Sequence, residues 1–135
     1  MTDTSTSQPV TSKVACDILL IEDDASLRQT LRDFLHDCGF NTFTAATRRE
    51  GWEMVQTLRP RLCLLDINLP DGSGLDVLRD IVDQGLPVRV IVMTAVPLQH
   101  LRPTYPTQIV AAWLDKPAHP QQLLEAVRGV LGNPD

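Results

Sequence analysis

The chain is short of several residue types, and each shortage narrows what the protein can be. Aromatic residues make up 4% of the 135 positions, so the core must consist mostly of aliphatic side chains. The net charge of −5 argues against a nucleic-acid-binding surface, which needs clustered Lys and Arg. Lysine occurs only as Lys13 and Lys116. No apolar run approaches the length of about 20 residues that a membrane-spanning helix needs. These shortages favour a small acidic protein that binds neither nucleic acid nor a membrane.

Cysteine is also scarce, and the chain ends are polar. Cys16, Cys38 and Cys63 are odd in number and lack the spacing of metal ligands, which favours a reduced, cytoplasmic setting. The first residues are rich in Ser and Thr without the apolar segment of a signal peptide, so we expect a disordered leader over 1–15. With 43% hydrophobic residues the remaining chain can fill one core. We therefore expect one domain over 16–132 and a tail over 133–135.

Apolar runs of strand length alternate with helical patterns. The runs predict strands at 18–21, 62–65, 90–93 and 111–114, with a weaker strand at 41–45. Amphipathic spacing and capping residues predict helices at 25–38, 47–58, 74–83 and 120–131. Such alternation is typical of βαβ units, in which a parallel sheet carries helices on both faces.

Polar residues follow the four strongest strands. They are Glu22-Asp23-Asp24, Asp66, Thr94 and Asp115-Lys116-Pro117. In an open parallel sheet, ligands bind in the crevice outside the carboxyl ends of the strands. Neighbouring acids suit Mg²⁺, whereas Asp24 better fits the N-cap of the following helix. A carboxylate such as Asp66 can attack phosphorus and hold an acyl phosphate when cations neutralise the transferring group.

Four motifs, in this order, resemble the receiver domain of two-component response regulators. They lie at 18–24, 64–75, 93–95 and 116–117, and the resemblance runs from about Asp17 to Leu131. It implies a CheY-like, flavodoxin-like α/β fold: a doubly wound, five-stranded parallel sheet with strand order 2-1-3-4-5. A receiver would have its fourth helix at 96–109, where this chain has three prolines, and an interior proline costs a helix roughly 3 kcal/mol. We expect that helix to be short, displaced or missing.

The resemblance implies a role for each residue of the acidic crevice. Asp66 would be the phospho-acceptor. Lys116 would pair with Asp66 before phosphorylation and with the phosphoryl group afterwards. Mg²⁺ would be bound by Asp23, by Asp66 and by the backbone carbonyl of Asn68, with Glu22 acting directly or through water.

Four further positions would serve the conformational switch. Thr94 resembles the hydroxyl that donates to a phosphoryl oxygen, and Ala95 resembles the small neighbour that leaves room for it. Trp113 stands three residues before Lys116, where it is either an aromatic switch residue or a fixed surface residue; both interpretations stay open. Pro117 resembles the cis-proline of the family, which turns the lysine inward.

The function that the resemblance implies is phospho-acceptance. A sensor histidine kinase would transfer a phosphoryl group to Asp66 in a Mg²⁺-dependent reaction, and the protein would be no enzyme beyond its own phosphorylation and dephosphorylation. The change would control a downstream effector domain or protein, with a DNA-binding transcriptional regulator favoured over a stand-alone receiver. A homodimer formed on phosphorylation is compatible with this interpretation.

Two other functions stay open. One is a receiver-like interaction module that takes no phosphate, which the proline-rich segment 96–109 favours. The other is a phosphohydrolase of the haloacid-dehalogenase type, which also uses an aspartate nucleophile and Mg²⁺. That chemistry needs a second aspartate two residues after the first, whereas this chain has Asn68 there.

Overall fold

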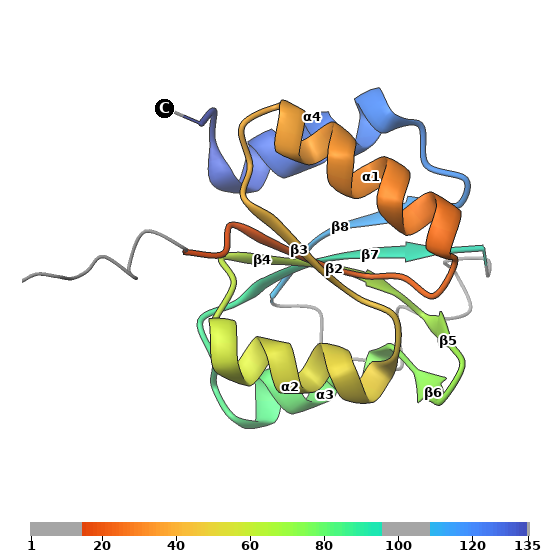
Figure 1. The fold of residues 1–135 in the computed structure, drawn as a ribbon. Helices are drawn as coiled ribbons and strands as arrows, with labels where there is room; N and C mark the ends of the chain where they lie inside the picture. The colour runs from red at the N-terminus through yellow and green to blue at the C-terminus, as the bar shows by residue number, and fades with distance from the viewer. Residues whose placement is uncertain (1–14, 96–108, 135) are drawn as a thin grey trace, which may run out of the picture.

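The computed structural model describes residues 15–95 and 109–134 (Figure 1). The predicted leader over 1–15 and the expected irregular helix over 96–109 lie outside the described residues, except for Ala15 and Ile109. Nothing in the fold therefore tests those two expectations.

Five parallel strands form one sheet in the described part of the chain. They are β2 (Ile18–Ile21), β3 (Thr42–Ala45), β4 (Leu62–Asp66), β7 (Arg89–Thr94) and β8 (Val110–Asp115). The order across the sheet is β3-β2-β4-β7-β8, which in chain order is the predicted 2-1-3-4-5. Every residue of β2 and β4 is buried. Strands covered on both faces are apolar throughout, which explains why these two were visible as continuous apolar runs.

Helices cover both faces of this sheet, as predicted. The described residues contain α1 (Ala25–Asp37), α2 (Arg48–Leu58), α3 (Leu75–Asp83) and α4 (Pro120–Leu131). Figure 1 shows α1 and α4 on one face and α2 and α3 on the other. A separate apolar cluster lies under each helix pair. None of these helices is long and apolar enough to span a bilayer.

The helix ends agree with the predicted ones to within about one residue. Leu75, Val77, Leu78 and Ile81 of α3 are buried, and Val82 is half-buried against the same cluster. These residues form the face by which α3 packs on the core.

A small hairpin, which the sequence did not predict, leaves the sheet after β4. Its strands are β5 (Asn68–Leu69) and β6 (Gly72–Ser73), paired antiparallel. Figure 1 shows it beyond the carboxyl end of β4 and ahead of α3. The hairpin thus begins two residues after Asp66.

The pairing of β7 with β8 contains one register shift. Val90 pairs with Val110, but Ile91 pairs with Ala112, so Ala111 has no partner in β7. Pairing is regular from Ala112 onward and brings Asp115 opposite Thr94. The carboxyl ends of β7 and β8 are consequently level, one residue before Lys116.

Candidate functional site

The carboxyl ends of the central strands bring polar side chains to one edge of the sheet. Asp66 is the last residue of β4, Thr94 is the last of β7, and Glu22 follows β2 directly. Glu22 and Thr94 are fully buried, and Asp66 is 3% exposed. Buried polar groups need partners. The burial of these three polar side chains therefore distinguishes this edge of the sheet from ordinary protein surface and makes it a candidate functional site.

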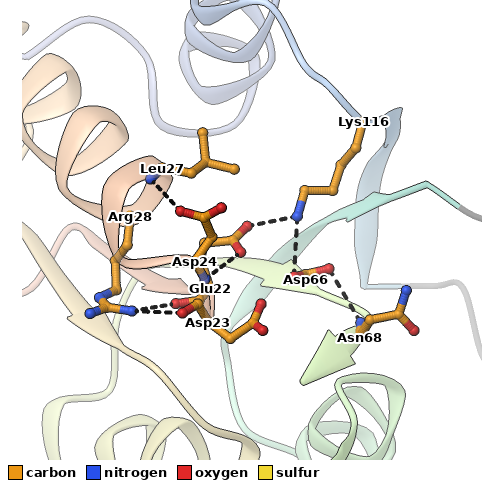
Figure 2. A network of polar contacts seen from close by, with 8 residues as sticks. All are labelled: Glu22, Asp23, Asp24, Leu27, Arg28, Asp66, Asn68 and Lys116. Atoms are coloured by element: carbon orange, nitrogen blue, oxygen red, sulfur yellow. Dashed lines mark hydrogen bonds and ion pairs between the residues drawn. The ribbon is translucent and has the colours of Figure 1, made fainter. Parts of the chain in front are cut away.

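Lys116 supplies the positive charge at this edge. Its Nζ lies 2.8 Å from Glu22 Oε1 and 3.2 Å from Asp66 Oδ2 (Figure 2). Its backbone N–H donates to the carbonyl of Thr94 at 2.8 Å, and the Lys116–Pro117 peptide bond is cis, as predicted. The lysine thus connects the ends of three strands, two through its ammonium group and the third through its backbone N–H.

Three carboxyl groups cluster at this edge, and two of them contact the ammonium of Lys116. Glu22, Asp23 and Asp66 each offer an oxygen, and these oxygens lie within 4.8 Å of one another. Asp23 is exposed to solvent, whereas the other two are buried. Asn68, at the start of the hairpin, donates its backbone N–H to Asp66 Oδ1 at 3.2 Å. Clustered hard oxygen donors with one solvent-facing side fit a hydrated divalent cation such as Mg²⁺.

Burial and charge shift the pKa values of the ionic pair. Burial raises the pKa of Glu22, reinforced by the nearby charge of Asp66, and the hydrogen bond from Lys116 only partly offsets the rise. Burial alone would lower the pKa of Lys116, but the hydrogen bond to Glu22 and the charge of Asp66 outweigh it and raise that pKa. Lys116 therefore stays protonated at neutral pH. The buried carboxylate of Glu22 beside it carries its negative charge at a cost in folding free energy.

The acidic loop after β2 is secured from helix α1. Asp24 Oδ1 accepts the backbone N–H of Leu27 at 3.0 Å, which confirms Asp24 as the N-cap. Arg28 donates from Nη1 to the carbonyls of Glu22 at 2.9 Å and of Asp23 at 3.3 Å (Figure 2). No role was predicted for Arg28. The only available signal was an arginine one helical turn beyond the acidic run.

The expected switch residues lie at or next to the same edge. Thr94 ends β7, Ala95 follows it and is exposed, and Trp113 of β8 is half-buried against the cluster under α2 and α3. The structure gives the positions of these residues, but it does not test their roles in switching. The role of the Asn68 carbonyl as a Mg²⁺ ligand and that of Asp66 as the phospho-acceptor likewise stay predictions.

Comparison with known families decides what kind of domain this is. The model of the response regulator receiver domain matches residues 18–128. The chain belongs to the response regulator receiver family. The resemblance inferred from the four motifs is thereby confirmed over nearly the whole folded part of the chain.

Curated relatives of this receiver domain are longer proteins. The KDP operon transcriptional regulatory protein KdpE of Escherichia coli is 38% identical over 78 residues, which are 58% of this chain and 34% of KdpE. The cell cycle transcriptional regulator CtrA of Caulobacter vibrioides is 47% identical over 62 residues, 46% of this chain and 27% of CtrA. The matches therefore span only about a third of these relatives.

Solved structures of receiver domains superpose along most of their length. A CheY-like receiver domain protein from Methanospirillum hungatei is 26% identical with a TM-score of 0.77, covering 83% of this chain and 90% of the other. The response regulator TrrA from Thermotoga maritima, in complex with Mg²⁺ and BeF, is 26% identical with a TM-score of 0.74, covering 84% and 97%. The predicted CheY-like fold is thereby confirmed.

Proposed function

We propose that this receiver domain accepts a phosphoryl group on Asp66 from a sensor histidine kinase, in a Mg²⁺-dependent reaction, and changes conformation to control an output. The observation that supports this most directly is the contact of Lys116 with both Asp66 and Glu22, at 3.2 and 2.8 Å, inside a trio of carboxyl groups. In that arrangement the proposed nucleophile, Asp66, lies beside an ammonium group and within an oxygen-rich cluster suited to a cation.

The residues that would bind Mg²⁺ are Asp23, Asp66 and the backbone carbonyl of Asn68, with Glu22 acting directly or through water. Their oxygens are hard donors, and the exposed side of Asp23 leaves room for the waters that Mg²⁺ keeps. When bound, the ion would neutralise negative charge on the transferring phosphoryl group. The Mg²⁺–BeF complex of TrrA supports the choice of ion.

The transfer itself needs little from the protein beyond positioning and charge. An oxygen of Asp66 would attack phosphorus, and the bond from phosphorus to the kinase histidine would break with its electron pair left on nitrogen. Lys116 already contacts Asp66 Oδ2 and would stabilise the added negative charge. Hydrolysis of the acyl phosphate would later return Asp66 to its starting state.

The switch would follow from the new dianion on Asp66. The hydroxyl of Thr94, at the end of the neighbouring strand, would donate to a phosphoryl oxygen, and Ala95 would leave space for that group. Trp113 would either respond to this movement or keep its half-buried place. Phosphorylation would thus shift an equilibrium between two conformations.

The output is inferred from the relatives. KdpE and CtrA are described as transcriptional regulators, and MtrA of Mycobacterium tuberculosis as a DNA-binding response regulator. These names support control of a DNA-binding effector, in the same chain or in a separate protein. Dimer formation on phosphorylation and a cytoplasmic location are part of the same proposal.

A small phosphodonor tests the proposal without the kinase. We expect acetyl phosphate with Mg²⁺ to add one phosphoryl group to the protein, measured by intact mass, and neither the Asp66→Asn variant nor a sample with EDTA to gain it. If Asp66→Asn gained as much mass as the parent chain, or if the parent chain gained none, Asp66 would not be the phospho-acceptor. The interaction module that takes no phosphate would then be the favoured alternative. Sustained Asp66-dependent turnover of a generic phosphomonoester would instead favour the hydrolase, for which Asn68 lacks the acid–base group.

A further inference from the structure

The β5–β6 hairpin carries a proposed metal ligand but is weakly held by its own contacts. Asn68, Pro70, Asp71 and Gly72 are exposed, and only Leu69 is buried. The two strands share two residue pairs. Isolated hairpins, even longer ones, are at best marginally stable in water. Something outside the hairpin must therefore fix the position of Asn68.

Asp71 provides that connection through the first turn of α2. Its Oδ1 accepts the backbone N–H of Arg48 at 2.7 Å, and its Oδ2 accepts that of Arg49 at 2.9 Å. The first N–H groups of a helix have no partner within the helix. The next N–H of α2, from Glu50, is bound by the hydroxyl of Thr47 at 3.0 Å. The start of α2 is thus capped jointly by its own N-cap residue and by the hairpin.

Arg48 strengthens the same connection with its side chain. Its Nε donates to the carbonyl of Asp71 at 3.3 Å, and its Nη1 lies 3.7 Å from Asp76 Oδ2 in the first turn of α3. A Cβ on Gly72 would lie 2.8 Å from Arg48 Nε. The absence of a side chain at Gly72 therefore lets the arginine lie along the hairpin. The hydrogen bonds from the backbone of Arg49 and Arg48 also lower the pKa of Asp71, which stays ionised at neutral pH.

The hairpin is thereby fixed at both ends. At its start, the N–H of Asn68 donates to Asp66 Oδ1, and just after it, Gly74 donates to the carbonyl of Ile67 at 2.7 Å. At its tip, Asp71 binds α2. We propose that Asp71 is a positioning residue for the phosphorylation site, which holds the hairpin against α2 so that the Asn68 carbonyl is already in place for Mg²⁺. This inference rests on the proposed function, of which that ligand is a part.

A ligand that is already in place lowers the cost of ordering the chain on binding. Removing the Asp71 carboxylate should therefore weaken Mg²⁺ binding, even though Asp71 itself does not touch the ion. The chain offers a matched control, because Thr47→Ala removes a cap from the same helix end without touching the hairpin.

Isothermal titration with MgCl₂ on the full chain would test this. We expect Asp71→Ala to raise the Kd for Mg²⁺ about tenfold, as loss of a residue that orients a ligand commonly does. Asp71→Asn should raise it less, because the amide oxygen can still accept one of the two N–H groups. Thr47→Ala should leave the Kd unchanged. The initial rate of phosphorylation by acetyl phosphate should fall in Asp71→Ala at low Mg²⁺ and recover at saturating Mg²⁺.

Each outcome has one meaning. An unchanged Kd in Asp71→Ala, or an equal rise in Thr47→Ala, overturns the positioning role. If Asp71→Ala does not fold by circular dichroism, the comparison of Asp71→Asn with Thr47→Ala decides in the same way. If the parent chain binds Mg²⁺ but gains no phosphoryl group, the proposed function fails while the Kd values still judge Asp71. If the parent chain binds no Mg²⁺, both proposals fail.

Discussion

The two ends of the central sheet carry the same kind of charge pair in different surroundings. At the carboxyl end, Lys116 lies 2.8 and 3.2 Å from carboxylates whose side chains are 1% and 4% exposed. At the amino end, Arg61 lies 3.5 Å from Asp17, and these side chains are 57% and 26% exposed. Exposed pairs contribute little, whereas breaking a buried pair leaves an uncompensated charge.

The balance of charge differs as well. Asp17 at the amino end has one cation and also accepts the backbone N–H of Asn41 at 2.8 Å, beside a pocket of about 400 Å³. At the carboxyl end, Lys116 contacts both Glu22 and Asp66, and a third carboxyl group, that of Asp23, lies within 4.8 Å of theirs. The charge of Asp17 is thus balanced at the amino end, whereas the clustered carboxyl groups at the carboxyl end carry more negative charge than Lys116 alone can neutralise. Functional sites commonly give up stability in this way.

Glycine substitutions should give the largest difference between the two ends. A Cβ on Gly74 would overlap the main-chain oxygen of Asp66, which cannot move without displacing the site. We expect Gly74→Ala to lower the free energy of unfolding by about 3 kcal/mol. At the amino end, Gly39 has φ +99°, and its added Cβ would lie 2.7 Å from the Pro134 side chain, near the end of the described residues. Gly39→Ala should cost about 1 kcal/mol. Urea denaturation measures both, and equal losses would contradict the comparison.

Removing the cation from each end should give the next largest difference. In EDTA, Lys116→Met should lower the free energy of unfolding by about 2 kcal/mol, because it leaves Glu22 and Asp66 facing each other in a buried site. Arg61→Met should cost about 0.5 kcal/mol, as expected for an exposed pair. In the same denaturation assay, saturating Mg²⁺ should reduce the difference in unfolding free energy between Lys116→Met and Arg61→Met. A loss in Arg61→Met as large as that in Lys116→Met would show that burial is not what separates them.

Replacing one acid by its amide at each end should give the smallest difference in the free energy of unfolding. At the carboxyl end the replacement should stabilise the protein, in contrast to the substitutions above. Because burial raises the pKa of Glu22, the folded protein binds that proton more tightly than the unfolded chain does, so its carboxylate destabilises the fold above its folded pKa. Glu22→Gln should therefore raise stability at pH 7 by about 1 kcal/mol while weakening Mg²⁺ binding. Asp17→Asn should change stability by less than about 0.5 kcal/mol.

The pH dependence checks the sign of that effect. The advantage of Glu22→Gln over the parent chain should shrink as the pH falls through the raised pKa of Glu22, because the parent chain then gains its own proton. Urea denaturation at pH 7 and pH 5, both in EDTA, gives the two values. If the stability advantage of Glu22→Gln stays constant or grows at pH 5, the buried carboxylate of Glu22 is not what destabilises the parent chain.

The parts of this molecule that were predictable share a local signal. Buried parallel strands are apolar along their whole length, and the polar residue after each run marks the functional edge. Glu22, Asp23, Asp66 and Lys116 were expected together on that basis and on the family resemblance, and the structure brings them together. The Thr47–Glu50 capping pattern likewise predicted the start of α2.

The role of Asp71 was missed because it depends on a contact distant in sequence. Asp71, in the run Pro70-Asp71-Gly72, has the composition of an ordinary turn, yet its partner is a helix end 23 residues earlier in the chain. No periodicity marks such a pairing, because it depends on where two separate segments meet in space.

The register shift at the start of β8 has a consequence for how the chain tolerates changes in length. Side chains alternate between the faces of a sheet at every residue, so losing one residue between Ala112 and Asp115 would turn Lys116 away from Asp66. Losing Ala111, which has no partner in β7, would leave the pairing from Ala112 onward intact. Deletion of Ala111 can thus be absorbed without moving Lys116, whereas a deletion just downstream of Ala112 cannot.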